Sequence, residues 1–376
     1  MSVAPAVKGW CPGAHRPMMS GDGLIVRVRP YFARLNAVQV QGLCEAAQTY
    51  GSGVLDLTNR ANLQIRGVSE QGQMPLLQAL DDLGLLDLSP ELEARRNVLV
   101  TPFWQDGDAT HRITRDLLSR LVQLPDLPAK FGLAVDAGPA PLLQEDSADI
   151  RVERSAQGWC VRADGADRGK PVAEPEIGAA VLDMARWFAA QRTAEERRMR
   201  AVVRRVALPA AWREVTPLPG GPRPAPGMHP LGAVVGAEFG QFEAASLARW
   251  MVETGAQALR VTPWRRIVLD GAAPERCDDL PTAEIMMRAD ACAGAPFCTG
   301  ATVETRALAR QLATVTQGSV HVSGCAKGCA RRGRADLTLI GRDGRFDLVR
   351  QGHAWDAPEK TGLRPDEILA ELKTTP

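Results

Sequence analysis

The sequence lacks long hydrophobic runs, an excess of charge of one sign and an export signal. Its best apolar stretch, Ile177 to Ala190, is broken by Asp183 and Arg186 and falls short of the roughly 18 uninterrupted residues of a membrane span. The 45 Lys and Arg residues and 44 Asp and Glu residues give a net charge of +1, which offers no bulk attraction for nucleic acid or an anionic membrane. The first ten residues, MSVAPAVKGW, contain no apolar segment of a secretory signal. We therefore expect a cytoplasmic protein without membrane or nucleic-acid partners, whose cysteines stay reduced.

Two further absences concern cofactors. No G-x-G-x-x-G motif follows a predicted strand, so we expect no NAD(P)H site in this chain. Only five histidines are present, and no set of two histidines and one carboxylate stands out as a site for a mononuclear non-haem iron. A redox enzyme with this sequence would therefore receive its electrons from a separate reductase or ferredoxin.

The length and composition fit a globular protein of two or more domains, and proline marks the border between them. The chain has 376 residues, 45% of them hydrophobic. Seven of its 27 prolines lie between Pro209 and Pro230, a density that excludes a helix or a central strand. This segment is predicted to connect two halves.

The two halves share an internal repeat at an offset of 204 residues. Thr58 and Gly67 in TNRANLQIRG match Thr262 and Gly271 in TPWRRIVLDG. Each match follows an apolar stripe with the spacing of an amphipathic helix. Each half is therefore predicted to hold a helix followed by a strand, the first of these strands running through VLDLTNRANLQIRG.

A second, shorter repeat at an offset of 187 aligns residues 148–152 with residues 335–339. It indicates that the segment after each first unit is duplicated too, although a match of five residues could be chance. The predicted plan is an α+β fold with a pseudo-two-fold repeat. Its parts are unit A1 (1–85), unit B1 (86–206), the proline-rich connector (207–230), unit A2 (231–283) and unit B2 (284–376).

Four of the eight cysteines are closely spaced. Cys292 and Cys298 form a C-x5-C pair, and after 26 residues Cys325 and Cys329 form a C-x3-C pair. Four thiolates are the ligand set of a [4Fe-4S] cubane, and the glycines beside them allow tight turns. Zinc is a weaker alternative because its cysteine pairs are usually two to four residues apart, and four unrelated buried thiols are another. The other cysteines, which show no such spacing, are Cys11, Cys44, Cys160 and Cys277.

Basic residues recur in the segments that also carry the repeat. From Arg60 to Arg66 the even positions are polar, so a strand would place them on one face, with the two arginines roughly 20 Å apart at about 3.3 Å per residue. That spacing suits a broad ligand with several negative charges, since guanidinium groups pair with carboxylates. The alternative for each residue is a solvated surface charge. The candidate binding residues are Arg60, Asn62, Gln64, Arg66, Arg96, Lys130, Arg265 and Arg331.

These motifs resemble the nitrite/sulfite reductase superfamily over nearly the whole chain. The resemblance is carried by LTNRANLQIRGV, RRNVLVTP, LPAKFGLAVD, LRVTPWRRIVL and the cysteine quartet. It implies ferredoxin-like units at A1 and A2 that alternate with 4Fe-4S-type α/β units at B1 and B2, with one [4Fe-4S] cluster bound by the quartet in B2. In the siroheme-containing members, the last cysteine, here Cys329, also bridges to the siroheme iron.

The resemblance also implies roles for two basic residues and shows one departure. The anion contacts of the family would fall on Arg66 and Lys130, which are the candidate catalytic residues. The family has two lysines in a KFK segment, whereas this sequence reads Lys130-Phe131-Gly132. The loss of the second lysine weakens the case for reduction of sulfite, whose negative charges need several cations.

Within the superfamily, CPGAHRPMMSGDGLIVRVRP and LRVTPWRR resemble the members that act on precorrin-3A in aerobic cobalamin biosynthesis. This implies an O2-dependent monooxygenase that hydroxylates C20 of that tetrapyrrole and forms a γ-lactone. The cavity that holds siroheme in the reductases would then hold the substrate. A mononuclear non-haem iron is also implied, with ligands that the sequence does not identify; His321 is expected to pack beside the cysteine loop. The alternatives are a siroheme-dependent sulfite or nitrite reductase and a tetrapyrrole carrier without activity.

Overall fold

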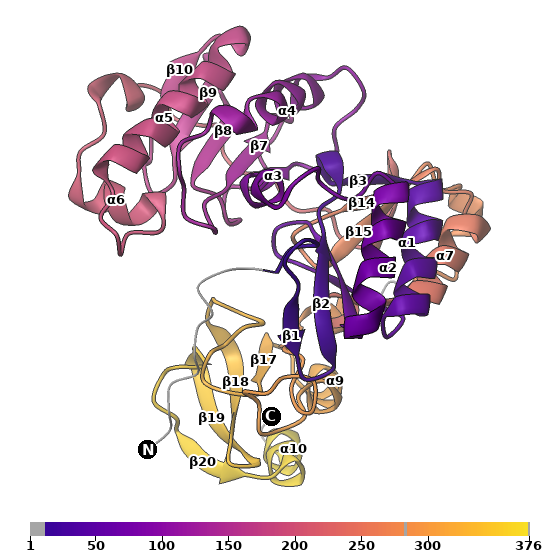
Figure 1. Cartoon of the computed structure of the whole chain (residues 1–376). Coiled ribbons are helices and arrows are strands. Elements are labelled where there is room, and N and C mark those ends of the chain that lie inside the picture. Colours follow the sequence, from indigo (N-terminus) through magenta and orange to yellow (C-terminus); the bar gives the residue numbers. More distant parts are fainter. Residues whose placement is uncertain (1–11, 282–283, 375–376) are drawn as a thin grey trace.

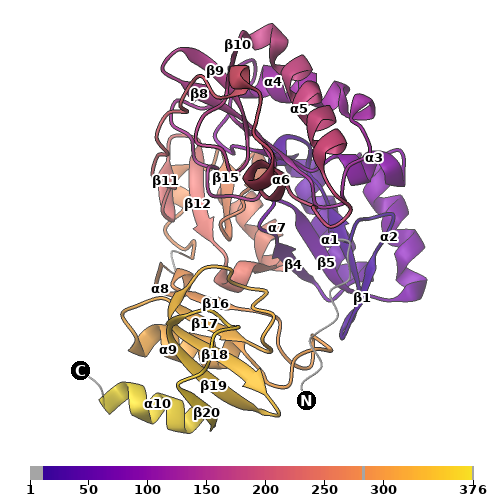
Figure 2. The ribbon, with the colours of Figure 1, turned by 90° about the vertical axis from the view of Figure 1, so that its left-hand side faces the viewer.

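A computed structural model describes residues 12–281 and 284–374, so Cys11 lies outside the described residues. These described residues form four five-stranded sheets. Three lobes can be seen in Figure 1, with unit B1 at the upper left, the central region built by A1 and A2 at the right, and unit B2 below; Figure 2 shows the central region between the two B units. None of the helices in the described part of the chain is long and apolar enough to span a membrane. The α+β architecture with two repeated mixed-sheet units confirms the predicted fold class.

The central region consists of two sheets that exchange their edge strands. β13 (Gln241–Glu243) pairs with β4 of the first half, and β3 (Arg34–Asn36) pairs with β14 of the second half. One hydrophobic core contains side chains of both halves, with the helices α1, α2 and α7 packed beside each other. A1 and A2 are therefore interlocked. Their other elements are β1 (Met18–Ser20), β2 (Gly23–Val28), α1 (Ala37–Tyr50), β4 (Val54–Leu57), β5 (Leu63–Val68), α2 (Glu70–Asp82), β11 (Gly227–His229), β12 (Gly232–Gly236), α7 (Ala244–Glu253), β14 (Ala258–Val261) and β15 (Arg266–Asp270).

The continuous strand predicted through VLDLTNRANLQIRG is wrong, because a tight turn divides it into β4 and β5. Thr58 donates its N–H to the Asn62 carbonyl at 2.9 Å, and Ala61 has a φ of 53°. The second half repeats this turn, with Arg265 at a φ of 56°. Arg60 therefore lies in the turn and does not share a strand face with Arg66.

Units B1 and B2 have the same topology. In each sheet, three strands run parallel and two further strands add antiparallel to them. The 187-residue offset matches β8 with β18. B1 contains β6 (Val98–Val100), α4 (Ala109–Ser119), β7 (Leu133–Asp136), β8 (Ile150–Ser155), β9 (Gly158–Ala163), β10 (Lys170–Val172) and α5 (Ile177–Gln191). B2 contains β16 (Ala289–Ala291), α9 (Arg306–Val315), β17 (Val320–Ser323), β18 (Ala335–Arg342), β19 (Arg345–Gly352), β20 (Lys360–Leu363) and α10 (Pro365–Thr374).

The proline-rich segment packs along unit B1. Val215 and Pro217 form bridges with Gly169 and Ser155, and β11 begins inside the segment at Gly227. Its prolines prevent regular structure over most of its length. Several of its backbone groups still have partners in unit B1: the N–H of Leu218 donates to the Arg154 carbonyl and the N–H of Gly221 to the Pro141 carbonyl. The short helices elsewhere are α3 (Pro90–Arg95), α6 (Met199–Arg205) and α8 (Glu284–Met287).

Asp136, at the end of β7, predicts a pH dependence of stability. Burial raises the pKa of this carboxyl from 3.8 to about 6, although Leu143 and Leu142 donate their N–H groups to it. Because the pKa is higher in the folded than in the unfolded protein, ionisation costs stability as the pH rises from about 4 to about 6. We expect Asp136→Asn, which keeps a carbonyl acceptor, to raise the free energy of unfolding by about 3 kcal/mol at pH 7.5 and far less at pH 4. Urea unfolding of both proteins at the two pH values measures this, and a difference independent of pH would contradict it.

Candidate functional site

Two loops at one edge of the B2 sheet carry the four cysteines. Cys292 follows β16 directly, and Cys298 lies farther along the same loop, while Cys325 and Cys329 follow β17. Because β16 and β17 are parallel neighbours, their carboxyl ends meet at the same edge. The N–H of Gly324 donates to Sγ of Cys292 at 3.2 Å, which joins the two loops.

Glycines keep space open around these sulfurs. Gly294 has a φ of 68°, and a Cβ atom there would lie 2.7 Å from Oγ1 of Thr305, whose hydroxyl donates to the Cys292 carbonyl. A Cβ atom at Gly324 would lie 2.6 Å from the Cβ of Ala301 and 3.5 Å from Sγ of Cys292. Both positions therefore require glycine for the loops to fold back in this way.

Three thiols of the quartet act electrostatically on the fourth, Cys329. The pKa of Cys329 is raised, first by loss of hydration and then by the charges of Cys292, Cys325 and Cys298, whereas Lys327 lowers it. Four thiols close enough to interact, an N–H directed at one sulfur and open loops are the features that a cubane needs. The residues present therefore fit a [4Fe-4S] cluster.

A site for a single metal ion is a different matter. Within residues 12–281 and 284–374, no three His, Cys, Asp or Glu side chains lie close enough together to hold one ion. A [4Fe-4S] cluster contains four irons, so its four thiolates would not have to converge on a single ion. The described residues do not fit the mononuclear non-haem iron that the resemblance implies.

A cleft of about 800 Å³ lies beside the cysteine loops and is lined by residues of both central halves and both B units. Cys292 and Cys329 form part of its lining. Its charged side chains are six arginines and three aspartates, a formal excess of three positive charges in a protein whose net charge is +1. The cleft therefore has the size and charge for a ligand with several carboxylates.

One wall of the cleft is a row of polar side chains across the first central sheet. Arg27 of β2 is opposite Gln64 of β5, which is opposite Asp56 of β4. The alternation that buries Val26 and Ile65 in the core turns these polar residues to the other face. Arg27 donates to Oε1 of Gln64 at 2.7 Å, so this face is held in place by contacts between strands.

Arg66 also lines the cleft, but two carboxylates pair with it. Its guanidinium forms a bidentate pair with Asp22, at 2.8 and 2.7 Å, and a third contact with Asp56 at 3.3 Å. It also donates to the carbonyl of Phe297, the residue before Cys298, at 3.5 Å. The arginine is buried, and its charge is balanced within the protein. This arrangement joins the β1–β2 turn to the first cysteine loop.

Arg265 is the third predicted residue that lines the cleft, with Gln64 and Arg66. It donates to the carbonyls of Ala289 and Met287 at 2.6 Å each and pairs with Asp290 at 3.3 Å. Arg331 pairs with the same aspartate at 2.8 Å but does not itself line the cleft. The turn of the second half thus supports the strand that leads to Cys292.

The remaining predicted residues lie outside the cleft lining. Arg60 donates to the carbonyl of Lys130 at 2.8 Å, and Asn62 belongs to the turn before β5. Arg96 forms a bidentate pair with Asp87, both at 2.8 Å, and its guanidinium lies 3.9 Å from the ring of Tyr31. Arg96 is 6% exposed, so its polar groups are used inside the fold.

Sequence reasoning missed several residues of the cleft, above all Arg223, Trp264, Arg306 and Asp146. Arg306 begins α9 soon after Cys298, and its position next to the cysteine loop was an available signal. Arg223 lies in the proline-rich connector, and nothing in that composition shows that the chain passes the cleft there.

His321 lies on β17 and is fully buried. Neither ring nitrogen has a hydrogen-bond partner within the described part of the chain. Burial lowers the pKa of this imidazole to about 4, so it is neutral at pH 7. Its proposed role beside the cysteine loop is therefore one of packing.

Known proteins resemble the chain in both sequence and fold. Residues 16–83 match the nitrite/sulfite reductase ferredoxin-like half domain family. A sulfite reductase [ferredoxin] of Mycobacterium tuberculosis is 24% identical over 88% of this chain and 71% of its own length. The structure of the NirA protein of M. tuberculosis matches 93% of this chain and 79% of its own with a TM-score of 0.61 at 20% identity, which shows the common fold.

A stronger similarity separates this chain from the reductases. A precorrin-3B synthase of a Sinorhizobium species is 30% identical over 95% of this chain and 86% of its own length. The identity thus extends over units A1, B1, A2 and B2. The chain therefore belongs to the precorrin-3B synthase family of oxidoreductases, within the nitrite/sulfite reductase superfamily.

Proposed function

We propose that the protein is a precorrin-3B synthase, which converts precorrin-3A to precorrin-3B with O2. The observation that carries the proposal is the cleft, where an excess of arginine faces two of the four clustered cysteines. Precorrin-3A is a broad macrocycle with many carboxylates, and arginine is the side chain best suited to pair with them. The cleft in this protein would hold this tetrapyrrole as substrate.

The reaction adds one oxygen atom of O2 at C20 of the substrate, and the other leaves as water. It consumes two electrons and two protons. The carboxyl group of the ring A acetate then adds to a double bond of the macrocycle, so that the lactone C–O bond forms, the carboxyl proton passes to the macrocycle and no further electrons are used. We propose that Cys292, Cys298, Cys325 and Cys329 hold a [4Fe-4S] cluster, which when bound supplies one-electron transfer. An external reductase or ferredoxin would provide the electrons. The cleft arginines bind and orient the carboxylates beside the cysteine loops.

The pairing of Arg66 supports this proposal over oxyanion reduction. A sulfite or nitrite ion needs cations with free hydrogen-bonding capacity, whereas Asp22 and Asp56 already accept from Arg66. The second lysine of the family is replaced by Gly132, and Lys130 does not line the cleft. Of the positions expected to bind a small oxyanion, Arg66 is neutralised by two aspartates, the second lysine is absent, and Lys130 lies outside the cleft lining.

Isotope labelling tests the proposal. Purified protein with its cluster is incubated with precorrin-3A, a chemical reductant and 18O2, and the product is analysed by mass spectrometry. We expect one labelled oxygen atom per product molecule. An unlabelled product, or no conversion of the substrate, in the presence of an intact cluster would overturn the proposal. An intense siroheme spectrum together with sulfite or nitrite turnover would establish the alternative function.

A further inference from the structure

The loop between β7 and β8 (137–149) occupies in unit B1 the position of the Cys325–Cys329 loop in unit B2. The two sheets have the same order of parallel and antiparallel strands, so β7 corresponds to β17 and β8 to β18. The B1 loop contains no cysteine. Protein contacts must therefore hold it.

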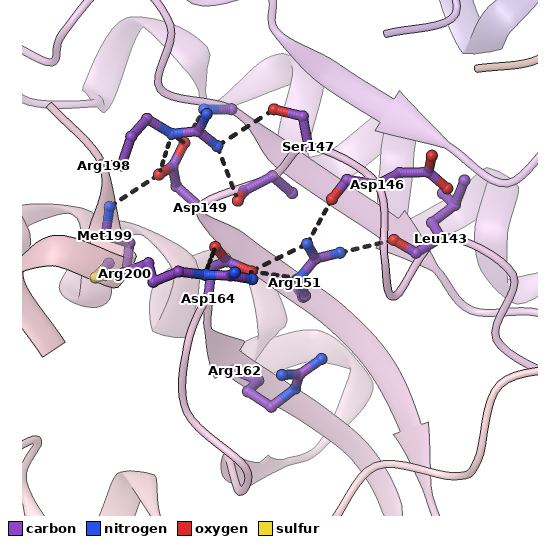
Figure 3. A network of polar contacts seen from close by, with 12 residues as sticks. Leu143, Asp146, Ser147, Asp149, Arg151, Arg162, Asp164, Arg198, Met199 and Arg200 are labelled. Carbon is purple, nitrogen blue, oxygen red and sulfur yellow. Dashed lines mark hydrogen bonds and ion pairs between the residues drawn. The ribbon is translucent and has the colours of Figure 1, made fainter. Parts of the chain in front are cut away.

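Arginine and aspartate side chains supply those contacts (Figure 3). Arg151, 2% exposed, donates to the carbonyls of Leu143 and Asp146 and pairs with Asp164 at 3.1 Å. At the end of the loop, Arg198 pairs with the buried Asp149 at 2.9 Å. Because Arg151, Asp149 and Asp164 are buried and hydrogen-bonded, they fix the path of the loop.

The fixed loop directs Asp146 into the cleft. Its Oδ2 accepts from Nε1 of Trp264 at 2.9 Å and from the guanidinium of Arg223 at 3.1 Å. Arg223 also lies 5.4 Å from the centre of the Trp264 ring. All three residues line the same cleft as Cys292 and Cys329. One carboxylate of B1 thus holds an arginine of the connector and an aromatic ring of A2.

We propose, on the basis of the proposed function, that Asp146 is a positioning residue for substrate binding. It holds Arg223 where the guanidinium pairs with a carboxylate at the rim of the macrocycle, and it holds Trp264 where the indole contacts the flat apolar ring. Aromatic and arginine side chains together match a ligand with a flat centre and an anionic rim. Unit B1, which lacks the cysteine quartet, thereby contributes to substrate recognition, and unit B2, which carries the quartet, to electron transfer.

The test compares Asp146→Ala and Asp146→Asn with the unmodified protein carrying its cluster. Precorrin-3A is titrated without O2, and binding is followed by the absorbance of the tetrapyrrole. We expect a Kd at least tenfold higher for the alanine variant and a smaller increase for asparagine, which keeps an acceptor. KM should rise with little change in kcat, while iron content and the electron paramagnetic resonance spectrum of the reduced cluster stay unchanged. Asp183→Ala, an exposed carboxylate on α5, is the matched control.

Coupling to Arg223 separates positioning from a general loss of structure. If Asp146 acts through Arg223, adding Arg223→Ala to Asp146→Ala should increase Kd by much less than Arg223→Ala alone does. Additive effects, or unchanged binding by both Asp146 variants, would overturn the inference. Lack of precorrin-3A binding by the unmodified protein would instead overturn the proposed function, so the two failures are distinguishable. If the alanine variant does not fold, the asparagine variant carries the same comparison.

Discussion

Replacing Cys329 with serine is expected to lower the iron and sulfide content of the purified protein and to abolish turnover. A serine hydroxyl is a much poorer ligand for cluster iron than a thiolate, and three cysteines do not complete the ligand set of a cubane. Cys329 also lines the cleft, so the change alters the wall where the proposed function places electron transfer to the substrate. Iron and acid-labile sulfide are measured chemically, and the cluster absorption near 400 nm is recorded on the same sample.

Cys277→Ser provides the control for this experiment. Cys277 is half-buried and lies outside both cysteine loops, with its thiol donating to the carbonyl of Ala273. We expect this variant to keep its iron and its activity. A Cys329→Ser protein with full cluster content and full turnover would show that the quartet is misassigned.

Replacing Arg66 with methionine is expected to lower the free energy of unfolding by about 3 kcal/mol, since it leaves two largely buried carboxylates without their cation. The side chains of Asp22 and Asp56 are only 14% and 12% exposed. From the sequence alone, weaker substrate binding is the expected result of removing this arginine. The structure shows that removing Arg66 would also lower the stability of the fold and remove a contact that positions the first cysteine loop at Phe297. Urea unfolding monitored by circular dichroism gives the change.

Two further variants test the cause of that change. Arg66→Met combined with Asp22→Asn should recover part of the lost stability, because one unpaired charge is removed. Arg112→Met, which breaks a solvent-exposed pair with Glu174, should have a much smaller effect. Equal losses for Arg66→Met and Arg112→Met would mean that the buried pairing of Arg66 contributes nothing.

The spacing of sequence motifs and the position of the proline-rich segment predicted the fold class, the internal repeat and the family. The 204-residue match holds because the β4–β5 and β14–β15 turns both need a threonine at the start and a residue with positive φ three positions later. The 187-residue match holds because β8 and β18 are central strands of equivalent sheets. Such local requirements leave a pattern in the residues themselves.

Much of the cleft left no such pattern. Arg60 and Arg66 read as one strand face because alternation cannot show that Ala61 turns the chain. Arg96 is in a basic motif, yet its partner is Asp87 inside the fold, and only tertiary packing decides that. Arg223 and Asp146 meet across the border between the connector and unit B1, from positions 77 residues apart. Contacts of this kind depend on tertiary packing, which the spacing of residues along the sequence does not encode.

The exchange of β3 and β13 determines how the protein could be divided. Each half completes the sheet of the other, so a chain cut in the proline-rich segment would leave two fragments with exposed sheet edges and an open shared core. Fragments produced separately should aggregate, whereas fragments produced together could assemble. The duplicated halves therefore depend on each other for folding. The side chains of the four units can change without affecting this exchange, but the two halves cannot fold as separate proteins.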